Sequence, residues 1–325
     1  MTEQTVRESL NQALREELAR DDRVFVYGED VGEYGGLYQV TTGLQEEFGE
    51  ERVFDTPLSE TAIVGSGVGA ALVGARPVPE VMFADFLAIV ADHLINYAAK
   101  MHFNYGDGTS VPLVVRTMYG AGDQFGLHHA QSVESWFQNV PGLKIVMPAS
   151  VRDYKGLLKA SIRDDDPVIF LEHKMRYDKT GDVPEGDFTV PLCESTVVRE
   201  GTDITIVALG GMVDEAQSAA VDLAHDGIDC EIVDPRTVVP LDVDPILGSV
   251  KKTNALVTAH EAPTFGGLGG EIVAQITEKA FFYLDAPVQR VGAPFTPVPF
   301  AENLENAYLP DQQDIAEAVR TALAT

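Results

Sequence analysis

Cysteine is scarce in this chain, since its 325 residues include only Cys193 and Cys230. Two isolated cysteines without a Cys-x-x-Cys pair cannot form the disulfide framework of a small secreted protein, and they suit a reducing cytoplasm. The segment Met1–Gln4 has neither basic residues nor an apolar run, so no secretory signal peptide is visible. We therefore expect a cytoplasmic protein.

Basic residues are also few. Lys and Arg number 23 against 51 Asp and Glu, which gives a formal net charge of −28. A surface this negative repels phosphates, which argues against binding to nucleic acids or to anionic membranes. Because the acidic residues are spread along the chain, we interpret them as a solvated surface adapted to high salt, as in halophilic organisms. The alternative is a protein that is merely acidic.

Long hydrophobic segments are missing as well. The longest uncharged apolar run, residues 61–75, ends at Arg76, so it is too short to span a membrane. Hydrophobic residues nevertheless make up 45% of the chain, which is enough to bury sizeable cores. Length and composition together predict a soluble protein with two domains of ordinary size.

Helical and strand patterns alternate along the first part of the chain. Continuous apolar strands separated by helices are typical of a parallel sheet with helices on both faces. The predicted helices cover residues 6–20, 38–48, 59–75, 85–102, 131–139 and 150–163, and the predicted strands cover residues 24–27, 52–54, 77–82, 112–116, 144–147 and 168–171.

A polar stretch with Pro and Gly, residues 179–187, interrupts this alternation, and a second alternating block follows. In that block we expect helices over residues 212–225, 267–282 and 311–324 and strands over residues 204–208, 229–233, 255–258 and 288–291. The predicted fold class is α/β with two doubly wound domains. The expected domains are residues 1–178 and 193–325, joined by a linker over residues 179–192.

The most informative motif is Asp55-Thr56-Pro57-Leu58-Ser59-Glu60, followed by the small-residue segment Gly65–Ala71. It places one carboxylate at the start of a helix that can be approached closely. A partly buried carboxylate suits proton relay, because desolvation raises its pKa toward the working pH. The alternative is that Glu60 only complements the helix dipole, with Ser59 or Thr56 as the cap.

This block resembles one in the beta subunits of the thiamine-diphosphate-dependent component of 2-oxo acid dehydrogenase complexes, the pyruvate dehydrogenase type. The resemblance covers nearly the whole chain and includes residues 28–31, 141–146, 167–172 and 260–263. It implies a pyrimidine-binding domain and a C-terminal domain of the transketolase superfamily.

The resemblance also implies roles for single residues in cofactor binding. Glu60 would hydrogen-bond the aminopyrimidine ring of thiamine diphosphate and drive it into its imino form. Phe86 would pack on the same ring, and Leu58 would line the pocket. The alternative for Phe86 is a core residue at a strand-to-helix turn.

The glycine-rich segment Gly120–Ser132 contains His128 and His129. Imidazole is a common choice for moving protons near neutral pH. In the family, the histidine directly before a small residue and Gln faces the cofactor and assists acyl transfer to lipoyl groups. Because Ala130 and Gln131 follow His129, the resemblance assigns this role to His129. The role of His128 stays open, and a surface loop is the alternative for both.

The family also binds a structural monovalent cation, K⁺ in our interpretation, largely through backbone carbonyl oxygens. Oxygen ligands are the ones that hard cations prefer. The alternative is a charged turn between a helix and a strand. The positions that match the family's cation site are Leu113, Ser161, Ile162, Asp164 and Asp166.

One expected motif is absent. Gly106-Asp107-Gly108 resembles the start of the Mg²⁺-diphosphate motif of thiamine enzymes, but it precedes a predicted strand, and the sequence contains no Asn-Asn pair. We interpret this triplet as a turn. The chain would then hold only the pyrimidine end of the cofactor. A separate alpha subunit would hold Mg²⁺ and the diphosphate in an α2β2 heterotetramer.

The main hypothesis is therefore a beta subunit that acts on a 2-oxo acid, pyruvate by default and branched-chain acids as the close alternative. It would acylate lipoyl groups and dock on a lipoyl acyltransferase core. An acetoin dehydrogenase beta subunit shares the same motifs, and a non-catalytic assembly subunit is the alternative of another class. The sequence retains both Glu60 and His129, which argues against a pure scaffold.

Overall fold

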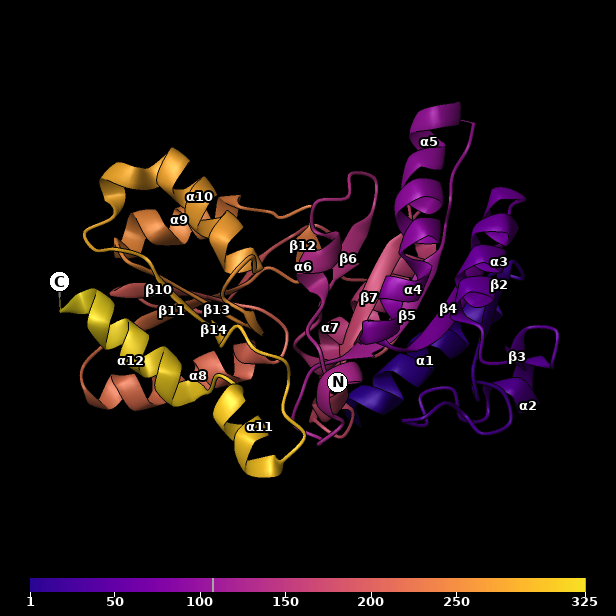
Figure 1. The fold of residues 1–325 in the computed structure, drawn as a ribbon, viewed down its shortest axis with the longest axis horizontal. Coiled ribbons are helices and arrows are strands. Elements are labelled where there is room, and N and C mark those ends of the chain that lie inside the picture. The colour runs from indigo at the N-terminus through magenta and orange to yellow at the C-terminus, as the bar shows by residue number, and fades with distance from the viewer. Residues whose placement is uncertain (107, 325) are drawn as a thin grey trace. The chain divides into compact units, whose positions relative to one another are not determined.

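The structure is a computed structural model, and its contacts divide the chain into two compact units (Figure 1). The first unit consists of Met1–Tyr119 and Asn139–Leu192. The second consists of Gly120–Gln138 and Cys193–Thr325. The segment Gly120–Gln138, which carries the two adjacent histidines, is therefore grouped with the second unit.

The structure describes residues 1–106 and 108–324. Within these ranges, no helix has the length and apolar character that a membrane span requires. The turn that we expect at Gly106-Asp107-Gly108 includes Asp107, which lies outside the described residues.

The first unit is built on a parallel sheet with the strand order β6-β7-β5-β4-β2-β3, and each neighbouring pair is parallel. Its strands are β2 (Val24–Gly28), β3 (Val53–Asp55), β4 (Arg76–Phe83), β5 (Val114–Tyr119), β6 (Lys144–Val146) and β7 (Val168–His173). Its helices are α1 (Val6–Arg20), α2 (Leu44–Phe48), α3 (Glu60–Leu72), α4 (Leu87–Asp92), α5 (Ala99–Tyr105) and α7 (Val151–Arg163), with the short 3-10 helices η1 (Ala84–Phe86) and η4 (Lys174–Arg176) and the π-helical turn η2 (His93–Ala98).

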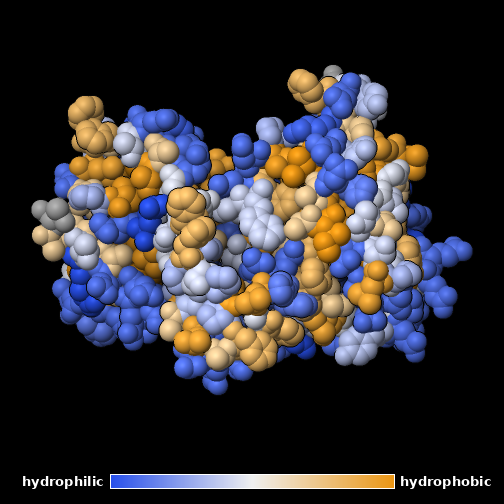
Figure 2. Space-filling model, in the orientation of Figure 1, coloured by the Kyte–Doolittle hydropathy of each residue, from blue (hydrophilic) through white to orange (hydrophobic). Residues whose placement is uncertain are grey.

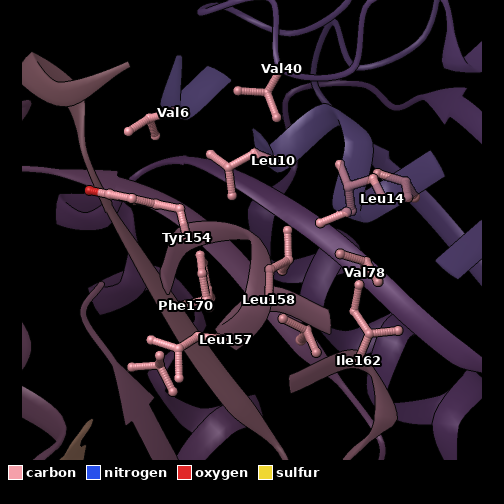
Figure 3. Packing of buried hydrophobic residues seen from close by; sticks show 14 of the residues in the cluster. Val6, Leu10, Leu14, Val40, Val78, Tyr154, Leu157, Leu158, Ile162 and Phe170 are labelled. Carbon is pink, nitrogen blue, oxygen red and sulfur yellow. The ribbon is translucent and has the colours of Figure 1, made fainter. Parts of the chain in front are cut away.

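Helices cover both faces of this sheet, because alternate residues of a strand point to opposite faces. On one face, Val24 and Val26 of β2 join an apolar core with α1 and α7. Figure 3 shows side chains of both helices, such as Leu10 and Leu158, in this core. On the other face, the hydroxyl of Tyr27 donates to a carbonyl oxygen of α3 at 2.6 Å. This arrangement confirms the predicted α/β fold.

Two predictions for the first unit are wrong in detail. Gln39 and Gly43 have φ angles of 61° and 77°, which interrupt a right-handed helix, so only Leu44–Phe48 of the expected helix is helical. Inside the expected linker, β8 (Thr180–Val183) pairs antiparallel with β1 (Thr2–Thr5). Because β1 and β8 lie far apart in the sequence, no local sequence pattern predicts that they pair.

The second unit contains a mixed sheet with the strand order β14-β13-β10-β11-β9, in which only β9 runs antiparallel to its neighbour. The sheet consists of β9 (Thr196–Arg199), β10 (Ile204–Ala208), β11 (Cys230–Asp234), β13 (Leu256–Pro263) and β14 (Gln289–Ala293). The short strand β12 (Thr237–Val239) also belongs to this unit but not to this sheet. Its helices are α6 (Glu134–Phe137), α8 (Met212–His225), α9 (Asp244–Thr253), α10 (Leu268–Ala280), α11 (Glu302–Tyr308) and α12 (Gln312–Leu323), with the 3-10 helices η3 (Gly126–His128) and η5 (Phe281–Tyr283).

Hydrophilic residues cover much of the surface of each unit. On the face drawn in Figure 2 they are spread over both units, with hydrophobic residues scattered among them. This distribution agrees with acidic residues that are dispersed along the sequence.

Candidate functional site

Three neighbouring parallel strands of the first unit, β3, β2 and β4, carry the candidate cofactor residues at their carboxyl ends. In the sheet register, Gly28 of β2 lies opposite Asp55 of β3 and Glu80 of β4. The chain leaves β3 toward Glu60 and leaves β4 toward Phe86. The carboxyl edge of a parallel sheet is where ligands bind in α/β folds. The topology thus gathers both residues at such an edge.

Glu60 is the first residue of α3 and is half-buried. Ser59 precedes the helix, but its side chain makes no capping hydrogen bond. The positive end of the helix dipole favours a carboxylate at this position. Within α3, Gly67 allows the helix to approach the sheet, since a Cβ atom there would lie 2.7 Å from the Tyr27 hydroxyl.

Leu58 lies two residues before this helix, in the turn that follows β3. Its side chain is 84% exposed, although it is apolar. An apolar side chain beside a half-buried carboxylate suits contact with a flat organic ring.

Glu29, directly after β2, is a site residue that the sequence reasoning missed. Its side chain is buried, and its Oε1 atom has no hydrogen-bond partner among the described residues. Burial raises the pKa of Glu29, and the charge of Glu60 raises it further. The charge of Glu60 is thus felt at the carboxyl group of Glu29. Perturbed carboxyl groups of this kind cluster at functional sites.

Phe86 ends the 3-10 helix η1 and is half-buried. Its ring meets that of Phe83 edge to face, with the ring centroids 5.9 Å apart and the ring planes at 89°. Phe83 is buried in the core, whereas Phe86 keeps part of its surface accessible. Phe86 is therefore placed at the margin of the core, where it could pack against a ligand.

His129 belongs to the second unit and directly follows η3. It is half-buried, and its ring lies 6.4 Å from that of Phe125, measured between ring centroids. His128 is exposed. The two adjacent histidines thus have different surroundings, and His129 is the more enclosed of the pair.

The predicted cation positions lie in the first unit, around the end of α7 and the start of β5. The carbonyl oxygens of Ile162 and Asp164 accept hydrogen bonds from Arg76 at 3.0 and 2.9 Å. The Lys144 ammonium group donates to the carboxylates of Asp164 and Asp166. Burial favours the neutral form of Asp166, but Lys144 and His102 outweigh it and hold its pKa below the usual value.

The backbone oxygen of Leu113 accepts a hydrogen bond from Val168, and that of Ser161 accepts one from Asp164. No cluster of three or more His, Cys, Asp or Glu side chains suited to a metal ion occurs in the described part of the chain. A cation here would therefore depend mainly on backbone carbonyl oxygens.

Comparison with known proteins places the chain in a family. Residues 2–179 match the model of the transketolase pyrimidine-binding domain, and residues 194–315 match that of the transketolase C-terminal domain. The chain is 46% identical to the pyruvate dehydrogenase E1 component subunit beta of Rickettsia felis, with 97% of each chain covered. The chain belongs to the beta subunits of the 2-oxo acid dehydrogenases. The family prediction is thereby confirmed.

Relatives within this beta-subunit family differ in the substrate that they are named for. The 2-oxoisovalerate dehydrogenase subunit beta of Bacillus subtilis is 45% identical, with 96% of each chain covered. The mitochondrial pyruvate dehydrogenase E1 component subunit beta of Dictyostelium discoideum is 43% identical, covering 98% of this chain and 90% of the relative. Because the identity to both kinds of relative is similar, sequence identity does not distinguish between pyruvate and 2-oxoisovalerate as the substrate.

Among solved structures, the beta-subunit fold is similar to one described as a split-gene transketolase, an inactive beta4 tetramer. The TM-score is 0.81 at 25% sequence identity, and 98% of each chain is covered. This likeness supports the two-domain α/β architecture of the transketolase superfamily.

Proposed function

We propose that this chain supplies the pyrimidine-binding half of a thiamine diphosphate site in an α2β2 enzyme. The enzyme decarboxylates a 2-oxo acid and transfers the acyl group to a lipoyl group on an acyltransferase core. The observation that carries the proposal is the buried carboxyl group of Glu29 at the carboxyl edge of β2, whose Oε1 atom has no hydrogen-bond partner within the described residues. Carboxyl groups are among the side chains that serve as general acids and bases.

The residues at this edge fit the pyrimidine end of the cofactor. Within the part of the chain that the structure describes, the Oε1 atom of Glu29 has no hydrogen-bond partner, so it is available to a ligand. Leu58 offers an exposed apolar side chain. When bound, thiamine diphosphate supplies the carbanion chemistry that cleaves 2-oxo acids. Glu60 would hold a proton between its carboxyl group and a pyrimidine nitrogen. Phe86 and Leu58 would orient the ring and exclude water.

Glu29 would line the same site, where its buried Oε1 atom can accept a hydrogen bond. His129 would move a proton during acyl transfer to the lipoyl group. In this proposal the Glu60 carboxyl group activates the cofactor, and the His129 imidazole acts in acyl transfer to the lipoyl group.

The second half of the site would come from an alpha subunit that holds Mg²⁺ and the diphosphate. The lack of an Asn-Asn pair supports this division, because the Mg²⁺-diphosphate motif of thiamine enzymes needs one. Large apolar side chains on the surface support a partner as well, with Phe103 92% and Phe282 96% exposed. Exposed apolar groups of this size are typical of interaction surfaces.

A structural K⁺ ion bound by backbone oxygens near Ile162 and Asp164 is also part of the proposal. A carbonyl oxygen has two lone pairs, so the hydrogen bonds from Arg76 leave each of these oxygens a second acceptor position. The carboxylates of Asp164 and Asp166 already pair with Lys144, so the ion would depend on the carbonyl oxygens.

Pyruvate is the first substrate to test, and branched-chain 2-oxo acids are the second because of the similarity to the 2-oxoisovalerate dehydrogenase subunit beta. The experiment is to co-express the chain with its cognate alpha chain and to assay several 2-oxo acids with an artificial electron acceptor. We expect decarboxylation of one acid class. Acetoin cleavage without 2-oxo acid turnover would favour the acetoin dehydrogenase alternative, and no turnover of either would favour an assembly subunit.

A further inference from the structure

The loop that carries His129 adopts an unusual backbone conformation. Gly120, Gly122 and Gly126 have φ angles of 96°, 108° and 70°, and Gln124 has a φ of 56°. Left-handed residues that alternate with other conformations turn successive N–H groups to one side and create a concave binding site for an anion. Such a loop is therefore suited to an anionic partner.

The partner is the side chain of Glu305 in α11. Its Oε1 atom accepts a hydrogen bond from the backbone N–H of Gly122 at 2.9 Å, and its Oε2 atom accepts one from that of Gln124 at 3.0 Å. The Glu305 side chain is 1% exposed, so water does not compete for these bonds. Hydrogen bonds from N–H groups to a carboxylate are roughly twice as strong as those between neutral groups.

A second carboxylate holds the two ends of the same loop. Glu261 of β13 accepts hydrogen bonds through Oε1 from the backbone N–H of Ala121 at 2.7 Å and from the Ser132 hydroxyl at 3.1 Å. Between the two anchors, Gly126 lies against Phe300, since a Cβ atom there would be 3.2 Å from its ring. The loop is thus fixed before and after His129, and Glu305 holds the part nearest to η3.

We propose that Glu305 is a positioning residue for His129: its carboxylate fixes the backbone at Gly122 and Gln124, so that His129, directly after η3, presents its imidazole in one orientation. This inference rests on the proposed role of His129 in acyl transfer. Glu305 does not touch the reacting groups. Its effect passes through the loop, whose glycines would otherwise sample many conformations.

The test uses the assembled α2β2 enzyme with the variants Glu305→Gln, Glu305→Ala and His129→Ala. Glu302→Gln is the matched control, because Glu302 is an exposed residue of the same helix. Three quantities are measured: single-turnover acylation of a lipoyl domain, decarboxylation with an artificial electron acceptor, and hydrogen–deuterium exchange of the peptide that covers residues 120–132.

We expect Glu305→Ala to slow acylation by about 10–100-fold, as misplacement of a catalytic group by about 1 Å can do. Decarboxylation should fall less than acylation, and the amides of Gly122 and Gln124 should exchange faster. Glu305→Gln keeps one acceptor oxygen and should give a smaller effect of the same kind. It also serves as the test if the Ala variant does not assemble.

Wild-type acylation in Glu305→Ala, or equal loss of both activities with unchanged exchange, would overturn the positioning role. The variant His129→Ala separates failure of this inference from failure of the proposed function. If His129→Ala acylates at the wild-type rate, the role of His129 is wrong. If His129→Ala is impaired and Glu305→Gln and Glu305→Ala are not, only the inference about Glu305 is wrong.

Discussion

Glu134 and Glu261 lie close enough in the second unit for the charge of one to shift the titration of the other. Glu134 is the first residue of α6, and neither of its carboxylate oxygens has a hydrogen-bond partner within the described residues. Burial and then the charge of Glu261 raise the pKa of Glu134 to about 7. The same two carboxyl groups also help to raise the pKa of the neighbouring Tyr308, which burial has already raised, to about 12.

We predict that this raised pKa makes the protein less stable as the pH rises from about 4.5 to above 7. In that window the folded state keeps the proton on Glu134 and the unfolded chain does not, so the free energy of unfolding falls with pH. The total effect is on the order of 3 kcal/mol. Glu134→Gln should abolish it and should be more stable than the wild type at pH 8. Urea unfolding between pH 5 and pH 8 measures this, and parallel pH profiles for the two proteins would contradict it.

A buried ion cluster supports the sheet beneath the candidate site. Arg116 is 1% exposed and donates to Glu172 at 2.7 and 2.8 Å and to Glu80 at 2.8 Å, while the Tyr177 hydroxyl donates to Glu172. Burial raises the pKa of Glu80, and the charge of Arg116 opposes this rise. The guanidinium group therefore neutralises two carboxylates that the core could not otherwise hold.

We predict that Arg116→Met destabilises the protein by about 3–5 kcal/mol, because it leaves buried charges without a partner. The loss should be smaller at lower pH, because protonation of Glu80, whose pKa burial raises, removes one of the unpaired charges. Arg23→Met is the matched control. Arg23 pairs with Asp21 at the surface, and such pairs contribute about 0–1 kcal/mol. Equal losses for the two variants in urea unfolding would count against the buried cluster.

Strong periodicity explains which elements could be predicted from the sequence. The helices Val6–Arg20 and Met212–His225 and the strand Ile204–Ala208 agree with the structure at both ends. The expected helix over residues 38–48 failed because positive φ angles are not visible in an apolar pattern. The helix α11 was not predicted at all, since a seven-residue helix carries too little periodicity to be recognised.

The candidate site was only partly accessible to the same reasoning. Glu60, Phe86 and His129 were found because short motifs resemble a family. The burial of Glu29 depends on how β2, β3 and β4 lie side by side, which no local pattern reveals. Glu305 contacts a loop more than 180 residues earlier in the chain, so its role is visible only in the folded unit.

We predict that Glu60→Gln slows exchange of the thiazolium proton in the assembled enzyme by about 10²–10⁴-fold, the usual cost of losing a proton-relay group. The amide keeps the shape of the side chain but cannot share a proton with a ring nitrogen. Circular dichroism should be unchanged. Glu46→Gln, which alters an exposed residue of α2, is the control and should exchange normally. A wild-type exchange rate in Glu60→Gln would reduce Glu60 to a helix-end residue.

We predict that the α2β2 assembly needs salt. With a formal net charge of −28, self-repulsion opposes association when screening is weak. The screening length is about 3 Å at 1 M salt and about 10 Å at 0.1 M. Dissociation should therefore begin as the salt concentration falls to about 0.1 M. Light scattering across a salt titration measures this. A tetramer that stays intact and active at low salt would leave the acidity as a solubility feature.

The same titration in NaCl and KCl separates general screening from the proposed K⁺ site. Screening depends on ionic strength alone, whereas a bound K⁺ ion would make KCl more effective at equal concentration. Identical midpoints in the two salts would contradict a selective cation site near Ile162 and Asp164.

The central claim is that this chain holds only half of a cofactor site, and calorimetry with thiamine diphosphate and Mg²⁺ tests it most directly. The titration is made once with the chain alone and once with the assembled α2β2 enzyme. We predict weak binding to the chain alone and tight stoichiometric binding to the assembly. Tight stoichiometric binding to the chain without an alpha subunit would contradict the divided site.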